Sequence, residues 1–329
     1  MSDAPPSAPF PKGLLLAMLL LSLADLCTGA MGFSLLGESG EVTRQVILRL
    51  RLPRVLGAIL GGGSLALAGL LMQGVLRNPL AAPATLGLNQ AAALGANFCL
   101  ILLPGLSRLP GATALCAFAA TLLAALLMSL VAQRGGLSPE SVVLAGMATG
   151  ALALSATTLV QCFAQDTQLA AALFWTFGDL GRITLPQCLL LLPPATLAAL
   201  LLHRGKWPLL ALEGSDLLAA SLGIPYQRLR QGALAVAALV TAVNVSLMGV
   251  VGFLGLLGPH LSRALGKGMR QGLPLRTFLT GGNLLLLADL LSRLLGRGIL
   301  LPVGALTALM GAPFFLWLLL RRRPHSPWP

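Results

Sequence analysis

Few residues within the apolar stretches of this chain could do chemistry. The ionisable side chains there are Asp25, His260, Arg263 and Asp289. Asp289 stands four residues before Arg293, which predicts an ion pair on one helix face. We interpret His260, which follows Pro259, as a structural residue at a helix end rather than a proton relay. A carrier driven by protons or sodium usually has carboxylates near the membrane midplane, and this pattern does not suggest one.

Catalytic motifs are also missing from the sequence. It contains no Walker-type phosphate loop, HExxH, GxSxG or carboxylate pair. The triplet Gly61, Gly62 and Gly63 lies within an apolar stretch, which favours close helix packing over phosphate binding. The five cysteines form no CxxC pair, and we interpret them as packing residues: Cys27, Cys99, Cys116, Cys162 and Cys188. We therefore predict no catalytic residue, no metal site and no cofactor, so energy for active transport must come from a partner.

The composition predicts what surrounds these residues. Of 329 residues, 56% are hydrophobic and only 10% are charged, whereas a soluble domain has roughly 25% charged residues. Runs of about 20 apolar residues cross the hydrocarbon core of a bilayer as helices. The runs are continuous rather than alternating, which favours helices over a barrel. The 38 Gly and 22 Pro are tolerated in membrane helices. The predicted fold class is an all-α polytopic membrane protein of about ten transmembrane helices.

Ten spans are predicted, at residues 13–33, 54–76, 88–103, 110–133, 141–164, 186–203, 229–250, 252–266, 277–295 and 302–320. The short spans 88–103 and 252–266 require burial among other helices. Residues 1–12 are predicted to be a disordered tail, 13–321 a single transmembrane domain and 322–329 a C-terminal tail. The first apolar run resembles a signal peptide, but no small-residue cleavage site follows, so we interpret it as a span.

The distribution of Lys and Arg predicts the orientation, because these residues favour the cytoplasmic side. With the N-terminus inside, fourteen of the 22 Lys and Arg fall inside and eight outside. Both termini are therefore predicted to be cytoplasmic. The net charge is +12, but the basic residues lie at the ends of apolar runs and form no single stripe. The chain has a single Tyr, so aromatic residues are not interleaved with the basic ones, and the charge does not indicate nucleic-acid binding.

A basic group on the outer side departs from this rule. Its members are Arg44, Arg49, Arg51 and Arg54 in the first external loop, with Arg293 and Arg297 beyond the ninth span. Two interpretations stay open from composition alone. The group binds an acidic partner, or its members contact lipid headgroups from the helix ends.

The longest cytoplasmic connection predicts a short amphipathic helix within residues 208–225. Ser215 suits an N-cap, Asp216 a first turn, and Gly223 the stop before Pro225. Leu217, Leu218 and Leu222 then share one side. Such a helix packs on the bilayer or docks a soluble partner.

Several ordered motifs carry a family resemblance. They are Arg51-Leu-Pro-Arg54, Gly69-Leu-Leu-Met-Gln73, Arg77-Asn-Pro-Leu80-Ala81, Leu144-Ala-Gly146, Leu173-Phe-Trp175, Gly252-Phe-Leu-Gly-Leu, Pro259-His-Leu-Ser-Arg263, Leu287-Ala-Asp289, Leu301-Pro-Val-Gly304 and Gly311-Ala-Pro-Phe-Phe-Leu-Trp317. Between residues 44 and 321 the chain resembles the iron-siderophore permease family of ATP-binding-cassette importers. That family includes the vitamin B12, ferric citrate, enterobactin and haem permeases.

The resemblance implies a ten-helix permease with the type II importer fold, which catalyses no reaction itself. It implies a bacterial inner-membrane location and four kinds of partner: a second permease copy or paralogue, two ATP-binding subunits, a periplasmic substrate-binding protein and membrane lipid. It also implies that Arg51, Arg54 and Arg293 dock the binding protein. Arg44 and Arg49 have no such match, and we interpret them as lipid contacts.

The resemblance also assigns residues on the cytoplasmic side. Segment 208–225 resembles the family's coupling segment, whose ATPase-coupling residues would be Glu213, Ser215, Asp216, Leu217, Leu218, Leu222 and Gly223. The order Leu212-Glu213-Gly214 departs from the family's Leu-Gly-Glu. The resemblance therefore supports the helix more strongly than it supports a role for Glu213. Asn78 and Leu80 match positions near the cytoplasmic gate. Glu140, at a second gate-associated position, and Gly258, which replaces an aliphatic residue, depart from the family's pattern.

The expected cargo is an iron chelate, a ferric siderophore or ferric citrate, from the likeness of Arg77-Asn-Pro-Leu80 and Gly87-Leu-Asn89 to those permeases. Haem, cobalamin and a metal oxyanion are the alternatives with the same architecture. Two other classes remain as rivals: a secondary carrier driven by an ion gradient, and a membrane-embedded enzyme.

Overall fold

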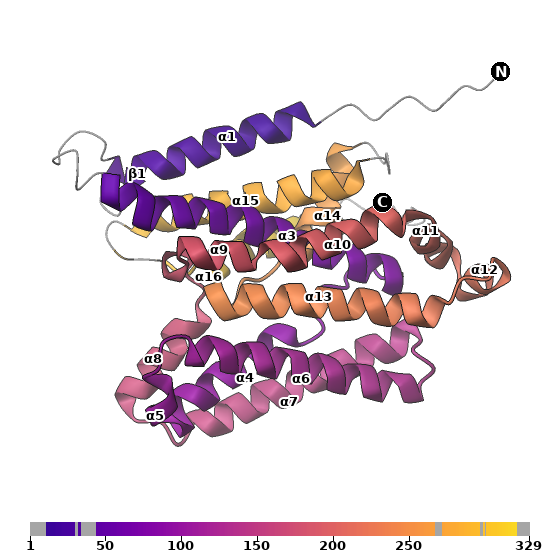
Figure 1. Ribbon diagram of the computed structural model, residues 1–329, viewed down its shortest axis with the longest axis horizontal. Coiled ribbons are helices and arrows are strands. Elements are labelled where there is room, and N and C mark those ends of the chain that lie inside the picture. The colour runs from indigo at the N-terminus through magenta and orange to yellow at the C-terminus, as the bar shows by residue number, and fades with distance from the viewer. Residues whose placement is uncertain are drawn as a thin grey trace.

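The molecule is a bundle of nearly parallel helices, seen from the side in Figure 1. The computed structural model describes residues 11–29, 32–33, 44–266, 272–296, 299 and 301–320. In Figure 1, α1, α15, α3 and α10 lie in the upper part, α13 crosses the middle, and α4, α6 and α7 form the lower part. The helices therefore share two common ends, where the connecting segments gather.

The elements follow in chain order. They are α1 (Lys12–Cys27), β1 (Thr28–Gly29), β2 (Gly32–Phe33), η1 (Ile47–Arg51), α3 (Leu52–Leu76), α4 (Leu88–Asn97), η2 (Phe98–Leu102), α5 (Pro104–Ser107), α6 (Ala112–Arg134), α7 (Pro139–Gln161), α8 (Asp166–Thr176), η3 (Leu180–Arg182), α9 (Leu185–Leu190), α10 (Leu192–Arg204), α11 (Lys206–Gly214), α12 (Asp216–Ser221), α13 (Tyr226–Met248), α14 (Leu254–Leu265), α15 (Leu273–Gly296) and α16 (Val303–Leu320).

Helices occupy all ten predicted spans, and the predicted all-α class is confirmed. Among the described residues, six helices are long and apolar enough to cross a membrane, and two shorter apolar helices accompany them. The first span was predicted too long, because α1 ends at Cys27 and a two-residue antiparallel pairing of β1 with β2 follows. The prediction missed α8, whose start is fixed by a capping box of Gln165 and Gln168. Apart from Pro11 and Lys12, the predicted tails lie outside the described residues.

Helix α3 is the centre of the bundle. It packs against α15, α13, α14 and α10, and 83% of its most apolar window is buried. A Cβ on Gly62 would lie 2.4 Å from the carbonyl oxygen of Gly281, and one on Gly69 would lie 1.8 Å from that of Gly255. No other residue type fits such backbone contacts. The predicted role of the glycine triplet in close helix packing is confirmed.

The two short predicted spans are buried, as expected. Helix α14 buries most of its first turns, and α4 packs between α6 and α7. His260 lies within α14 rather than at its end: its Nδ1 is 2.9 Å from the carbonyl oxygen of Leu256, and its ring meets Phe315 edge-on. The structure also explains Gly258, because a Cβ there would lie 2.5 Å from the Cβ of Ala66. An aliphatic side chain at this position has no room against α3.

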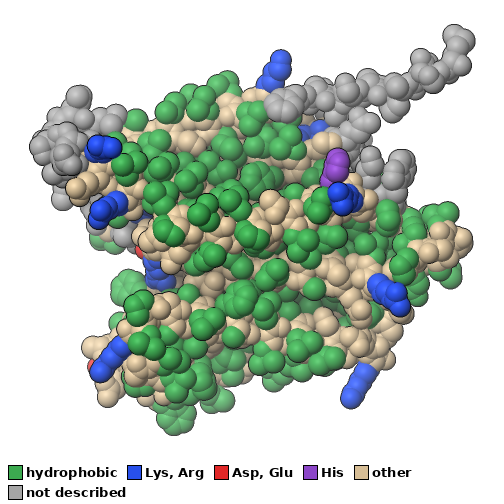
Figure 2. Space-filling model, viewed as in Figure 1, with side chains coloured by type: hydrophobic (Ala, Val, Ile, Leu, Met, Phe, Trp, Pro, Cys, Tyr) green, Lys and Arg blue, Asp and Glu red, His purple; other side chains and the backbone are tan. Residues whose placement is uncertain are grey.

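The outer surface is apolar along the helices. On the face shown in Figure 2, hydrophobic side chains cover the middle, and Lys and Arg gather toward the two ends. Helices α6 and α7 expose a series of large apolar side chains, among them Leu115, Leu123, Leu144 and Leu152. A contiguous apolar belt bounded by basic ends is the surface expected of a protein surrounded by lipid.

The glycine contacts give a first prediction. Gly69→Ala should destabilise the protein by about 1–3 kcal/mol, because the added methyl group must separate α3 from α14. The matched control is Gly232→Ala, because no heavy atom lies within 4 Å of the added Cβ there and alanine favours a helix. Thermal unfolding in detergent measures both. Equal unfolding temperatures for the two variants would contradict the packing role of Gly69.

Candidate functional sites at the two ends of the helices

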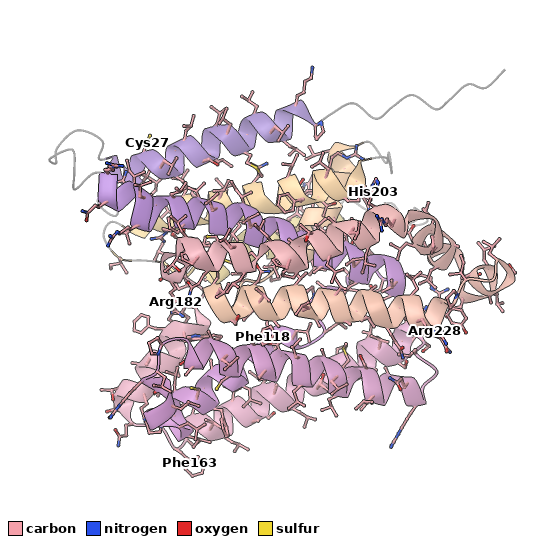
Figure 3. All side chains as sticks on the ribbon, in the orientation of Figure 1. Cys27, Phe118, Phe163, Arg182, His203 and Arg228 are labelled. Carbon is pink, nitrogen blue, oxygen red and sulfur yellow. The ribbon has the colours of Figure 1, made fainter. Side chains whose placement is uncertain are left out.

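Charged residues gather where the helices end, and we name the two ends by their elements. The η1 end holds η1, η3 and the C-terminal part of α15. The α12 end holds α11, α12 and the turn between α6 and α7 (Figure 1). Figure 3 labels Arg182 near the first end and Arg228 near the second.

At the η1 end, Arg54 joins three elements. Its Nη2 donates a hydrogen bond to Asp289 at 3.1 Å, and the same nitrogen lies 3.6 Å from Asp179. Asp179 in turn accepts from the backbone N–H of Gly181 at 2.7 Å. Arg54 therefore ties α3 to α15 and to the segment that carries η3.

Arg293 extends this network to α1. Its guanidinium donates to Asp25 in a close ion pair and to the backbone carbonyl of Thr28 at 2.6 Å. It also lies 2.9 Å from Asp289 on its own helix, with angles outside those of a hydrogen bond. The predicted pair of Asp289 and Arg293 is confirmed. The partnership with Asp25 was missed, because 268 residues separate the two in sequence.

Arg182 also lies at the η1 end. Its guanidinium donates to the backbone carbonyls of Trp175 at 3.2 Å and Phe174 at 2.5 Å. Burial lowers the pKa of Arg182, and the charge of Asp179 opposes that change. The segment between α8 and α9 is thus held by its own arginine.

The three arginines expected to dock a binding protein are largely enclosed in this structure. Arg51 and Arg293 are 8% and 5% exposed, and the side chain of Arg54 is 13% exposed. Arg51 donates to the carbonyl oxygen of Leu26 at 2.6 Å. By contrast Arg44 and Arg49, interpreted from sequence as lipid contacts, are exposed, and Arg297 lies outside the described residues. Docking through the three enclosed arginines thus requires carboxylates that replace their present partners.

At the α12 end, the predicted amphipathic helix is present. The Ser215 side chain accepts from the backbone N–H of Leu218 at 2.9 Å, so it caps α12 as expected, and Gly223 has φ +72° at the stop. Leu217 is 84% exposed, Leu222 61% and Leu218 47%. A preceding helix, α11, was not predicted, and it places Glu213 in its last turn, exposed. Three exposed leucines on a short helix form a surface that fits a partner or a bilayer.

The predicted gate positions follow the end of α3. Arg77, with φ +48°, is the C-cap, and Asn78 accepts from the backbone N–H of Leu80 at 2.9 Å. Leu80 is exposed. Nearby, α7 begins with Ser138, which accepts from the N–H of Ser141, so Glu140 occupies the first turn of that helix. An acidic residue there is favourable because a helix N-terminus is electropositive.

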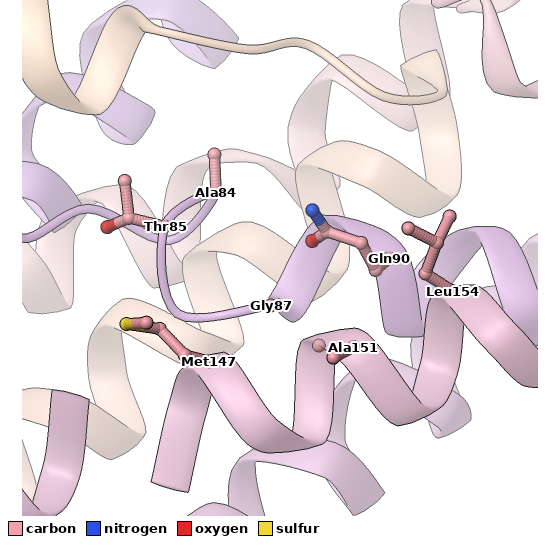
Figure 4. Close-up of a pocket in the computed structure, with 8 residues that line it drawn as sticks. Ala84, Thr85, Gly87, Gln90, Met147, Ala151 and Leu154 are labelled. Carbon is pink, nitrogen blue, oxygen red and sulfur yellow. The ribbon is translucent and has the colours of Figure 1, made fainter. Parts of the chain in front are cut away.

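A shallow pocket lies between α4 and α7. Its volume is about 170 Å³, and Figure 4 shows residues 84–90 on one wall and α7 on the other. The lining consists of Ala84, Thr85, Gly87, Gln90, Met147, Gly150, Ala151 and Leu154. The lining carries no formal charge, and the side-chain oxygen of Gln90 has no hydrogen-bond partner among the described residues.

A solved structure shares this arrangement over nearly the whole chain. It is described as an inward-facing conformation of a metal-chelate type ATP-binding-cassette transporter, with a TM-score of 0.82 and 30% identity, over 95% of this chain and 100% of that one. The likeness defines the class: a multi-pass membrane permease subunit of an ATP-binding-cassette importer, and not an enzyme.

The chain belongs to the FecCD transport family, whose model matches residues 13–321. An ATP-binding-cassette transporter permease protein of Methanocaldococcus jannaschii is 38% identical, with 94% of this chain and 93% of the relative covered. The Fe(3+) dicitrate transport system permease protein FecD of Escherichia coli K12 is 36% identical, with 87% and 88% covered. The vitamin B12 import system permease protein BtuC of Shigella boydii is 34% identical, with 93% of each covered.

The network at the η1 end yields a second prediction. Arg293→Met should destabilise the protein by about 3–5 kcal/mol, because it leaves the buried carboxylate of Asp25 without its cation. Adding Asp25→Asn to Arg293→Met should restore part of that loss. Thermal unfolding in detergent is the measurement, and Arg49→Met, at an exposed arginine, is the control. If Arg293→Met unfolds at the temperature of the control, Arg293 has no structural role.

Proposed function

We propose that this chain is the transmembrane subunit of an ATP-driven importer that moves an iron chelate across a bacterial inner membrane. The observation that carries this proposal is the match over 95% of the chain to a metal-chelate type transporter. The 36% identity to a ferric dicitrate permease supports the same cargo class. Cobalamin is the second candidate, favoured by the 34% identity to a vitamin B12 permease.

A second permease copy or paralogue completes the pathway in this proposal. The pocket between α4 and α7 holds about 170 Å³, whereas sites for ligands of ordinary drug size hold roughly 300–1,000 Å³. This pocket is therefore too small for a chelate, and a pathway between two chains removes the difficulty. The uncharged lining fits passage without trapping. Asn78 and Leu80 would lie where this pathway meets the cytoplasm.

Two ATP-binding subunits supply the energy, and each binds the α12 of one permease chain. Its exposed leucines offer an apolar surface at the end of the bundle, and Glu213 lies just before it. Closure of the ATP-binding subunits would move α12, and the spans would then open the pathway to one side at a time.

A periplasmic substrate-binding protein delivers the chelate at the η1 end. In the proposal, carboxylates of the binding protein bind Arg51, Arg54 and Arg293 and replace the internal partners of these arginines. Arg54 is the most accessible of the three, with a side chain 13% exposed. Docking would then loosen the link between α1, α3 and α15 while it binds the partner.

An ion-driven secondary carrier is the rival, together with haem and oxyanion cargoes. The two carboxylates described within the apolar helices, Asp25 and Asp289, are both ion-paired with Arg293. Paired carboxylates are poor sites for a coupling ion, which weighs against the carrier.

Uptake by intact cells tests the proposed function. Cells with and without this gene receive labelled ferric citrate, a ferric siderophore, haem and cobalamin. Loss of uptake of one ferric chelate, also abolished by an ATPase-dead partner, is the expected result. Loss of cobalamin or haem uptake alone would keep the importer and overturn the iron cargo. Uptake that follows an ion gradient and ignores the ATPase would establish the secondary carrier instead.

The α12 contact gives a third prediction. The double variant Leu217→Asp and Leu218→Asp should reduce co-purification of the ATP-binding subunit by at least about ten-fold, because it places two charges in an apolar contact. The control is Gln227→Asp, an exposed position next to α12. Unchanged co-purification of the double variant would refute this contact.

Docking at the η1 end gives a fourth prediction. Arg54→Glu should weaken binding of the substrate-binding protein by about ten-fold or more, because like charges then meet. The paired change Arg44→Glu and Arg49→Glu, at exposed arginines, should have a smaller effect. Both are measured on folded protein by biolayer interferometry at low and high salt. The reverse order of effects would move the docking site to Arg44 and Arg49.

A further inference from the structure

We propose that Arg230 is a positioning residue that transmits movement of α12 to the two segments beside the predicted gate. The inference rests on the proposed function, in which α12 contacts the ATP-binding subunit. It is carried by a junction at the α12 end that we call the Arg230 clasp. Its members are Arg230, Asp216, Arg77, Val75 and Leu137.

Arg230 lies in the first turns of α13, and its side chain is fully buried. Its Nε donates to the carbonyl oxygen of Val75 at 3.0 Å, and its Nη1 donates to that of Leu137 at 2.5 Å. Its Nη2 donates to the carboxylate of Asp216 at 2.7 Å. The guanidinium is planar and its donors have fixed directions, so three partners are held in one geometry.

The three partners belong to different elements. Asp216 is the first residue of α12, Val75 lies in the last turn of α3, and Leu137 lies in the turn between α6 and α7. Asp216 also lies 3.4 Å from Arg77, the C-cap of α3. A displacement of α12 therefore acts on the ends of three spanning helices through directional bonds.

Two residues with strained backbone lie in the segments that a displacement of α12 would move. Arg77 and Leu137 have φ of +48° and +56°, and they are two of the three non-glycine residues with positive φ in the described chain. Such backbone conformations are unfavourable for non-glycine residues and persist only where the surroundings hold them. Arg77 directly precedes Asn78, and Leu137 directly precedes the Ser138 cap of α7. Both gate segments are thus held in strained turns by the clasp.

Stability alone is a weak reason for this arrangement. Buried ion pairs are often replaceable by apolar residues without loss of stability, and α12 could have been held by leucines like the rest of the bundle. Instead its leucines are exposed, and a charged residue makes the link to the ends of α3 and α6. The planar guanidinium fixes both the distances and the directions between its three partners, so these segments must move with α12.

The test uses the complete transporter, with its ATP-binding subunits and substrate-binding protein, in proteoliposomes. Two rates are measured on the same vesicles: ATP hydrolysis, and uptake of whichever labelled compound the unaltered transporter carries among ferric citrate, a ferric siderophore, haem and cobalamin. Their ratio, chelate moved per ATP hydrolysed, reports transmission. A merely structural role would lower both rates together and leave the ratio unchanged.

Arg230→Lys should lower this ratio by about ten-fold, a typical size for coupling between sites. The ammonium group keeps the charge but does not reproduce the three-pronged geometry. Asp216→Asn, which leaves the Ser215 cap in place, should lower the ratio in the same direction, and Asp216→Glu should restore part of it. The matched control is Arg228→Gln, an exposed arginine on the same helix, which should leave the ratio unchanged.

A second measurement needs no cargo. In a cysteine-free background, maleimide labelling of Leu80→Cys should respond to ATP in the unaltered clasp and lose that response in Arg230→Lys. An unchanged transport ratio and unchanged labelling in Arg230→Lys would overturn the inference while the importer stands. An unaltered transporter without ATP-dependent uptake of any of the four compounds would overturn the proposed function, and the inference with it.

Discussion

The close approach of helix backbones along α3 is the constraint on which the rest of the structure depends. Lipid offers no hydrophobic gain for pressing two apolar helices together, so contact between their backbones must hold them. Glycines supply that contact where α3 meets α15 at Gly62 and Gly281, and where it meets α14 at Gly69 and Gly255. A side chain at Gly62, Gly69 or Gly281 would push the neighbouring helix away, because its Cβ would lie within 2.4 Å of a backbone oxygen.

Helix α3 also links the two charged ends. Arg54, near its first turn, binds Asp289 of α15 and lies close to Asp179 near η3. At the other end, the carbonyl of Val75 accepts from Arg230, and Arg77 shares Asp216 with it. A 25-residue helix spans about 38 Å. The charged residues around Arg54 and those around Arg230 are therefore attached to opposite ends of the same rigid helix. In the proposed importer, events at either end therefore act on the same central helix.

The two ends differ in what they leave accessible. At the η1 end Arg54 and Arg293 are turned inward onto buried carboxylates, so a partner that binds them must compete with an existing network. At the α12 end Arg230 is buried and paired with Asp216, whereas Leu217 and Leu222 stay exposed. An apolar contact needs no exchange of ion pairs. In the proposed importer we therefore expect a lasting association of the ATP-binding subunit at the α12 end and a transient one of the substrate-binding protein at the η1 end.

Local sequence patterns determined the spans, the helix α12 and the pair of Asp289 and Arg293. Each of these depends on hydrophobic runs, a cap residue or a spacing of four, all of which lie within one helix. The family resemblance added the class of protein. The enclosure of Arg51, Arg54 and Arg293 went against the simplest picture of a docking surface, because sequence places a residue near a membrane face but does not say which way its side chain turns.

Only the tertiary structure decided the partners of the buried charges. Asp25 meets Arg293 across 268 residues, and Arg230 reaches Val75 across 155 and Leu137 across 93. It also decided why Gly258 is glycine, through the closeness of Ala66. Such choices depend on which helices become neighbours, and that follows from packing across the whole bundle. The sequence by itself determined that the chain crosses a membrane many times, because burial of apolar runs is a local property, whereas the pairing of charges between helices is not.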